Sequence, residues 1–238
     1  MKLLSRNFKT AGCLILCLIS QISEASQPES KCYGTSSQGK LIHGFLLPKK
    51  GSNFVVFSEL AWHLGRTYVH SKVAEIIFES YKQLAIDVPG KKFMFAETGW
   101  PKGGEFPPHK THQNGLSVDF MVPALDEEGR SSYLPITMKN KFGYNIEFDE
   151  EGNFDQYAID FAALAIHLKV LNETAKSQGF GINRIFFDPS LQRKLFATDE
   201  GAYLKKNITF NTKQSWVRHD EHYHVDFDLP CEKLNQSK

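Results

Sequence analysis

Two short histidine clusters, far apart along the chain, constrain this sequence more than any other feature. Together they hold five of the nine histidines in a chain of 238 residues. The first cluster reads HKTHQNGLSVDF and contains His109, His112 and Asp119. The second reads RHDEHYHVDF and contains His219, His222 and His224. If the clusters act together, the fold must bring them to one place, and this requirement limits the folds open to the chain.

The residue types in the clusters indicate a metal site. Neutral imidazole and carboxylate are common ligands of Zn²⁺, and a catalytic zinc takes three protein ligands plus a water molecule. His112, Asp119 and His224 supply such a set, so we predict that they bind one zinc ion. Two alternatives stay open. One is a closed structural site with His109 as a fourth ligand, and the other is two unrelated groups of surface histidines.

A zinc ion with an open position predicts hydrolysis of an amide bond, most simply in a peptide. The metal lowers the pKa of bound water and polarises a carbonyl group. A base near the metal favours the reaction, and we expect it to be His222, which shares a strand face with His224. Glu221 competes for this role, but strand alternation predicts that it faces away from His222. We expect His219 and His109 to orient the base or stabilise the oxyanion.

The start of the chain predicts export. Lys2, Arg6 and Lys9 precede a mostly apolar run over residues 11–22, and small residues before position 26 favour cleavage after Ala25. We therefore expect a signal peptide over residues 1–25 and a single domain over residues 26–238. An uncleaved anchor is the alternative. The net charge of +1 argues against a nucleic acid or an anionic membrane as partner, and no later stretch is apolar enough to span a membrane.

Cysteine usage agrees with export. Cys13 and Cys17 lie in the expected leader, which leaves Cys32 and Cys231 near the two ends of the mature chain. In an oxidising compartment the simplest expectation is a disulfide between them, with two free thiols as the alternative. Closing so long a loop is worth roughly 4–5 kcal/mol in the chain-entropy account.

Hydrophobic spacing places the clusters on a mixed set of elements. It predicts helices over residues 71–86, 154–177 and 189–195. It predicts strands over residues 92–97, 116–122, 184–187 and 222–228. Irregular structure is expected over residues 123–153. Alternation along the strands turns Asp119 toward a cleft and Val118 toward the core. It also places His222 and His224 on one face of the last strand, together with Asp226 and Asp228.

The motif His112-Gln113-x-Gly115-x-x-x-Asp119, followed by His222-x-His224, resembles the zinc peptidases grouped with lysostaphin, the D-Ala-D-Ala carboxypeptidases and the hedgehog signalling domain. Within this group the sequence is most similar to the penicillin-insensitive murein endopeptidases. Gly99-x-Pro101-x-Gly103-Gly104-x-Phe106 before the first cluster and the spacing His219-x-x-His222 add to the likeness.

This resemblance implies an α+β fold with a small central antiparallel sheet that carries the zinc site, flanked by helices and long loops. It implies a periplasmic enzyme that cleaves peptide cross-links between the stem peptides of peptidoglycan. By the resemblance, the ligands of the one zinc ion are His112, Asp119 and His224. His222 is then the base, His219 its helper and His109 an accessory residue, and the Cys32–Cys231 pairing matches an end-to-end disulfide.

Two other functions remain open from the sequence. The first is a peptidoglycan D,D- or L,D-carboxypeptidase of the same fold, which would trim stem peptides and leave the cross-links intact. The second belongs to another class: a zinc-binding module without catalytic activity, which would recognise the cell wall or a partner protein.

Overall fold

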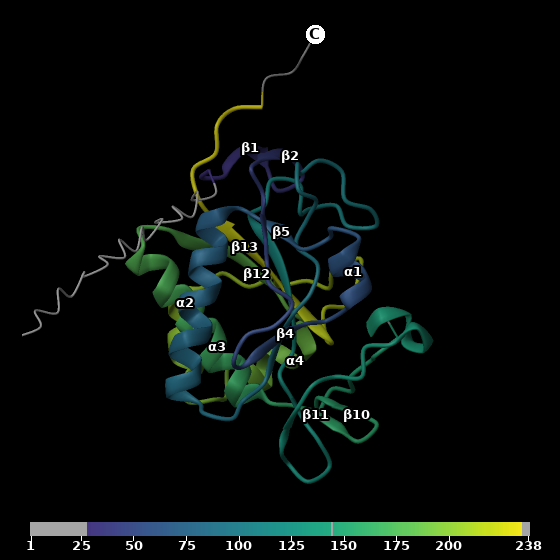
Figure 1. The fold of residues 1–238 in the computed structure, drawn as a ribbon. Coiled ribbons are helices and arrows are strands. Elements are labelled where there is room, and N and C mark those ends of the chain that lie inside the picture. Colours follow the sequence, from purple (N-terminus) through teal and green to yellow (C-terminus); the bar gives the residue numbers. More distant parts are fainter. Residues whose placement is uncertain (1–27, 144, 235–238) are drawn as a thin grey trace, which may run out of the picture.

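The computed structural model describes residues 28–143 and 145–234, and its centre is a five-stranded sheet. The expected signal peptide lies outside the described residues. The sheet has the order β12-β13-β7-β6-β4 (Figure 1). Its strands are β4 (Phe54–Val56), β6 (Phe93–Phe95), β7 (Ser117–Met121), β12 (Gly181–Phe186) and β13 (His222–Asp228). All neighbours are antiparallel except β4 and β6, which pair in parallel. The α+β class is confirmed, with one parallel pair at the edge of the sheet.

The pairing of β7 with β13 fixes how the two clusters meet. Asp119 lies opposite His224, and Met121 lies opposite His222. Directly opposed residues of an antiparallel pair point to the same face, so these side chains gather on one side of the sheet. The other face is apolar and fully buried, with Val118, Phe120, Tyr223 and Val225. The alternation predicted for both strands is therefore confirmed.

Two long helices cover the apolar face of this sheet. They are α2 (Ser71–Asp87) and α3 (Phe161–Ser177), which lie side by side in Figure 1. His167 of α3 packs between them and the sheet, with its ring 5.5 Å from Tyr81 of α2 and 5.1 Å from Phe120 of β7. This histidine belongs to the core and takes no part in the site. The predicted helix over residues 71–86 is confirmed to within one residue.

The predicted start of the other long helix is wrong. Residues 153–159 form the hairpin of β10 (Asn153–Phe154) and β11 (Tyr157–Ile159), which joins β8 (Ala124–Leu125) and β9 (Ser131–Ser132) in a second sheet. Asp155 at the turn has a φ of 47°, and the Asp160 side chain accepts a hydrogen bond from the Ala163 amide, so the helix begins after Asp160. Apolar residues continue across this turn, and for this reason their spacing did not reveal it.

Short elements complete the fold around the site. The chain begins with the hairpin of β1 (Lys31–Thr35) and β2 (Gln38–Ile42), and β3 (Phe45–Leu46) pairs with β5 (Tyr68–Val69). Helix α1 (Glu59–His63) and the 3₁₀ segment η1 (Met138–Gly143) lie on the side away from α2 and α3 (Figure 1). Helix α4 (Pro189–Leu195) matches its predicted range, and α5 (Gly201–Asn207) follows it.

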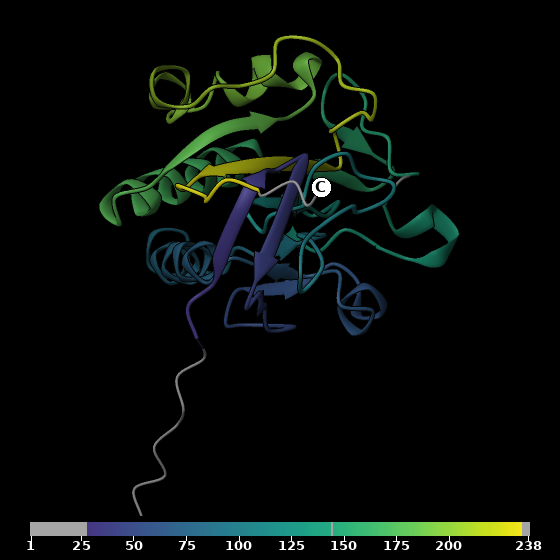
Figure 2. The same ribbon diagram turned by 90° about the horizontal axis from the view of Figure 1, so that it is seen from above.

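A disulfide joins the two ends of the described chain. Cys32 of β1 is bonded to Cys231, which follows β13, and the Gly34 amide donates a hydrogen bond to the Glu232 carbonyl. Figure 2 shows the β1–β2 hairpin running beside the C-terminal segment. The predicted pairing is therefore confirmed. No helix among the described residues has the length and apolar character needed to cross a membrane.

Candidate metal site and cleft

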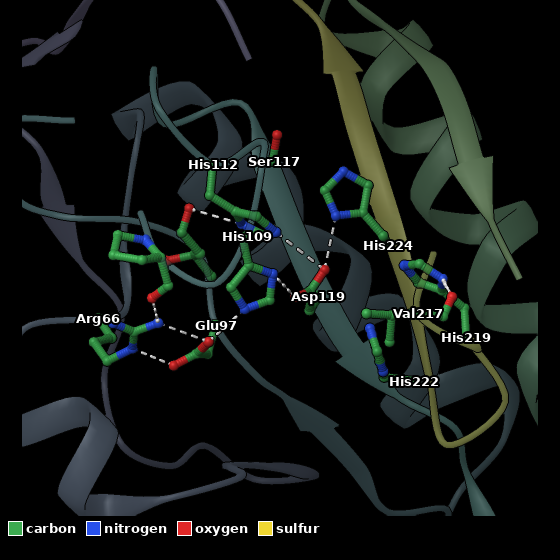
Figure 3. A network of polar contacts seen from close by, with 12 residues as sticks. Arg66, Glu97, His109, His112, Ser117, Asp119, Val217, His219, His222 and His224 are labelled. Atoms are coloured by element: carbon green, nitrogen blue, oxygen red, sulfur yellow. Dashed lines mark hydrogen bonds and ion pairs between the residues drawn. The ribbon is translucent and has the colours of Figure 1, made fainter. Parts of the chain in front are cut away.

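The sheet and one long loop together deliver the predicted ligands to a single carboxylate. Asp119 of β7 and His224 of β13 are cross-strand partners, and Nδ1 of His224 lies 2.8 Å from Oδ1 of Asp119. His112 arrives on the loop before β7, and its Nε2 lies 3.3 Å from the same oxygen. Figure 3 shows Asp119 between His112 and His109 on one side and His224 on the other. The two clusters of the sequence thus meet.

Two distances to Asp119 can be compared with the ligand spacing around a tetrahedral metal ion, although His224 is not part of the group of side chains whose ligand atoms lie close enough together to hold one, which is His109, His112 and Asp119. Ligand atoms bound to zinc at its usual bond lengths lie about 3.3 Å apart. The separation between His112 and Asp119 equals this spacing, and the 2.8 Å contact of His224 would widen slightly on metal binding. In addition, Nε2 of His112 is buried and makes no hydrogen bond within the described residues. A buried polar atom without a partner is costly, and a metal bond would satisfy it.

In each of the three imidazoles at the site, the ring nitrogen that points away from Asp119 lies within hydrogen-bonding distance of an oxygen atom. Nδ1 of His112 lies 3.2 Å from the Thr98 carbonyl oxygen, which is an acceptor only. Nε2 of His224 lies 2.9 Å from Asp226, and Nε2 of His109 lies 2.6 Å from Glu97. Such outer partners orient the rings of metal-binding histidines and select their tautomer. All three inner nitrogens are consequently directed toward Asp119.

His109, predicted as an accessory residue, also belongs to the cluster. Together with His112 and Asp119 it forms a group whose ligand atoms lie within 4.8 Å of one another, a group able to hold a metal ion. However, Nδ1 of His109 lies near the other carboxylate oxygen, 3.7 Å from Oδ2 of Asp119. His112 and His224 approach Oδ1. The three histidines therefore surround both oxygens of the Asp119 carboxylate.

The loop that carries His112 is held in an unusual conformation. His112 has a φ of 68°, in the left-handed region that non-glycine residues seldom adopt, and such residues concentrate at functional sites. Gly99 packs directly on this backbone: a Cβ atom there would lie 2.7 Å from the His112 carbonyl oxygen. The amide of Gln113 donates to the Ser36 carbonyl. These contacts fix His112 from both sides.

His222, predicted as the base, lies beside these residues with an unexpected partner. Nδ1 of His222 is 2.9 Å from a carboxylate oxygen of Glu221, and both side chains line one cleft. The expectation that Glu221 faces away is wrong, because Glu221 precedes the first residue of β13 and does not follow its alternation. His219 packs beside them, with its ring centroid 4.7 Å from that of His222, and its Nδ1 lies 2.9 Å from the Val217 carbonyl oxygen.

Burial and charge act in opposite directions on the site's pKa values. Burial alone would raise the pKa of Asp119, but the adjacent His112 and His224 outweigh it and hold this pKa well below its usual value. Burial lowers the pKa of His224, yet its bonds to Asp119 and Asp226 raise it to about 10. Burial likewise opposes the charge of Glu221, which raises the pKa of His222 to about 9. His219 lacks such a partner, and burial lowers its pKa to about 3.

The site opens into a cleft with two lobes that share His109 and His222. The first lobe is largely apolar, with Phe57, Leu60, Leu64, Met121 and Phe142 among its lining residues. The second lobe contains Lys110 close to the ring of Trp216. A chain bound across His222 would therefore find room on both sides.

Sequence reasoning missed the residues behind His109. The guanidinium of Arg66 makes two hydrogen bonds to the carboxylate of Glu97, and it lies over the ring of Phe106 at 4.1 Å. Burial raises the pKa of Glu97, but its bonds to His109 and Arg66 hold it below the usual value. No local sequence pattern predicts these contacts, because Arg66 and Glu97 belong to different loops.

The fold and the site define an α+β protein with a candidate metal centre in an open cleft. The chain matches the family model of the penicillin-insensitive murein endopeptidases over residues 32–237, and it therefore belongs to that family. Membership of this family supports a peptidase that acts on murein. No curated protein matches the chain.

Proposed function

We propose that this protein is an exported zinc metallo-endopeptidase that hydrolyses the peptide cross-links of peptidoglycan in the periplasm. The observation that carries the proposal is the convergence of His112 and His224 on Oδ1 of Asp119 inside a cleft with two lobes. Family membership supports the substrate. The expected signal peptide over residues 1–25 and the disulfide at Cys32 support export.

Three ligands with one open position account better for the geometry than four. A zinc ion shared by His112 and His224 would lie on Oδ1 of Asp119, whereas His109 lies nearest to Oδ2. We therefore assign His112, Asp119 and His224 as ligands of one ion, with His109 as an accessory residue. When bound, zinc would supply a water molecule of lowered pKa and a Lewis acid for the scissile carbonyl.

His222 is our candidate for the base, and Glu221 is its orienting partner. The carboxylate of Glu221 accepts a hydrogen bond from Nδ1 of His222, which leaves Nε2 to take up a proton. This arrangement follows the logic of carboxylate–imidazole pairs in other hydrolases, where the carboxylate selects the tautomer. The proton held by His222 is then available to the leaving amine.

His219 and His109 complete the set. The hydrogen bond from Nδ1 of His219 to the Val217 carbonyl leaves Nε2 as the nitrogen open to the substrate, and the lowered pKa keeps this ring neutral. Glu97 lies 2.6 Å from Nε2 of His109, and Nδ1 of His109 is directed to the Asp119 side. We assign His219 to the support of His222 and His109 to the orientation of the attacking water.

An endopeptidase agrees better with the two-lobed cleft than a carboxypeptidase does. Cleavage inside a cross-link requires room for peptide on both sides of the scissile bond. Here the lobe at Leu60 and Leu64 and the lobe at Trp216 meet at His222. A carboxypeptidase needs space on one side and a closed end that receives the terminal carboxylate.

The proposal is tested by digesting purified murein with residues 26–238 and separating the muropeptides by mass spectrometry. The expected result is loss of cross-linked dimers, and His222→Ala, with zinc retained, should abolish it. Release of terminal residues with intact dimers would indicate a carboxypeptidase. Zinc binding with no change in any muropeptide would favour a recognition module and contradict the proposal.

A further inference from the structure

Asp226 is a buried carboxylate directly behind a proposed zinc ligand. It lies on β13 two residues after His224, and only 3% of its surface is exposed. Oδ1 accepts hydrogen bonds from Nε2 of His224 at 2.9 Å and from the hydroxyl of Ser117 at 2.7 Å. Oδ2 accepts one from Arg184 at 3.2 Å. Among the described residues, those that line the two lobes of the cleft do not include Asp226, so it does not touch a bound peptide there.

These bonds determine which nitrogen of His224 keeps its proton when the other nitrogen binds a metal ion and the ring is neutral. A neutral imidazole has one N–H and one lone pair, and an ionised carboxylate is an acceptor only. We propose that Asp226 is a positioning residue of the zinc site: it holds the proton of His224 on Nε2 and so presents the lone pair of Nδ1 to the metal. The inference rests on the proposed function, because it needs His224 to be a ligand. Carboxylates in this outer position typically strengthen metal binding by about 10- to 100-fold.

The partners of Asp226 predict what an asparagine would do in its place. Arg184 is a donor and must meet an acceptor, so the amide oxygen of Asp226→Asn would take the position of Oδ2. The NH₂ group would then face Nε2 of His224, which has to become an acceptor. The proton moves to Nδ1, and the tautomer is wrong for binding the metal. The hydroxyl of Ser117 rotates freely and imposes no preference.

The test is the zinc dissociation constant of the folded protein, measured by competition with a chromophoric chelator. Asp226→Asn should weaken zinc binding by about 10- to 100-fold. The matched control is Asp228→Asn, which removes the same charge from the same strand at an exposed position and should change the constant less than twofold. The spectrum of the Co²⁺-substituted protein should also change in Asp226→Asn, because the coordination of the ion is altered. Zinc binding by Asp226→Asn as tight as in the control would overturn the inference.

A double variant separates positioning from a loss of charge or of folding. Arg184 is partly exposed, and Arg184→Met removes the donor that fixes the amide. In Asp226→Asn with Arg184→Met, the amide oxygen is free to turn to His224, and zinc affinity should recover to within a few-fold of Arg184→Met alone. Affinity as weak as in the single variant would contradict positioning. If the parent protein itself binds no zinc, the proposed function fails. If the parent binds zinc and the Asp226 variants bind it equally tightly, only this inference fails.

Discussion

The two halves of the candidate site are built in different ways. Asp119 and His224 are cross-strand neighbours in the centre of a sheet, so backbone pairing sets the separation of their Cα atoms. His109 and His112 come from a loop, and their positions depend on contacts with distant residues such as Glu97 and Gly99. The sheet therefore fixes the backbone of Asp119 and His224, whereas contacts with other parts of the chain fix the positions of His109 and His112. Substitutions should affect the two halves differently.

The largest effect should be on zinc binding, and it should distinguish the three ligands from the accessory residue His109. Asp119→Ala, His112→Ala and His224→Ala should each weaken zinc binding by more than about 100-fold, because each removes a ligand atom and not merely its support. His109→Ala should keep one zinc ion per chain and lose most of its activity. Metal analysis after gel filtration, together with muropeptide digestion, checks both. Stoichiometric zinc in His224→Ala combined with its loss in His109→Ala would reverse the assignment.

The second effect should fall mainly on the stability of the fold and much less on zinc binding. Cys32→Ser opens the loop closed by the disulfide, which should lower the free energy of unfolding by about 4 kcal/mol and the melting temperature by about 10 °C. Zinc affinity of the folded variant should change far less than in the ligand variants, since the disulfide lies beyond the end of β13 and meets the His112 loop through the contact of Asn114 with Sγ of Cys231. Calorimetry of the parent with and without a reductant provides an independent comparison.

A third effect should be confined to the half of the site that comes from the loop. Gly99→Ala places a methyl group against the His112 carbonyl and should cost about 1–3 kcal/mol of stability, with weaker zinc binding as His112 moves. The matched control is Gly104→Ala in the same loop, because a Cβ there meets no atom within 4 Å although φ is also positive. Denaturant unfolding and chelator competition measure the two effects. Equal results for the two variants would show that the close contact at Gly99 is unimportant.

The smallest effect concerns the base. Glu221→Gln removes the charge that, against the opposing effect of burial, raises the pKa of His222 to about 9. The pKa of His222 should therefore fall, and because the base acts unprotonated, the acid limb of the kcat/KM profile should move to lower pH. We expect kcat to fall about tenfold as the ring loses its orientation. Glu127→Gln, at an exposed position, is the control. An unchanged profile would favour a base other than His222.

The positions of the site residues on the strands could be predicted from the sequence, whereas those of the site residues on the loop could be predicted only in part. The range of β13 and its alternation follow from a local period of two, so the shared face of His222, His224 and Asp226 could be predicted. The role of Asp226 could not, because it depends on the position of Arg184 in a neighbouring strand. Likewise, the salt bridge of Glu97 with Arg66 joins two loops whose packing no local pattern encodes.

The errors have the same origin. Glu221 was placed on the wrong side because alternation was extended one residue beyond the strand, where the chain turns. The helix before Phe161 was started too early because the apolar residues of a hairpin happened to continue its stripe. In both cases the side-chain pattern continues past the element, and a turn or a cap determines where the element ends.

The most direct test of the central claim is a crystal structure of the zinc-loaded protein with anomalous diffraction data collected at the zinc absorption edge. We predict one ion bound by Nε2 of His112, Oδ1 of Asp119 and Nδ1 of His224, with a water molecule in the fourth position and His109 beyond bonding distance. An ion bound by His109 in place of His224, or closed off by all four residues, would contradict the account.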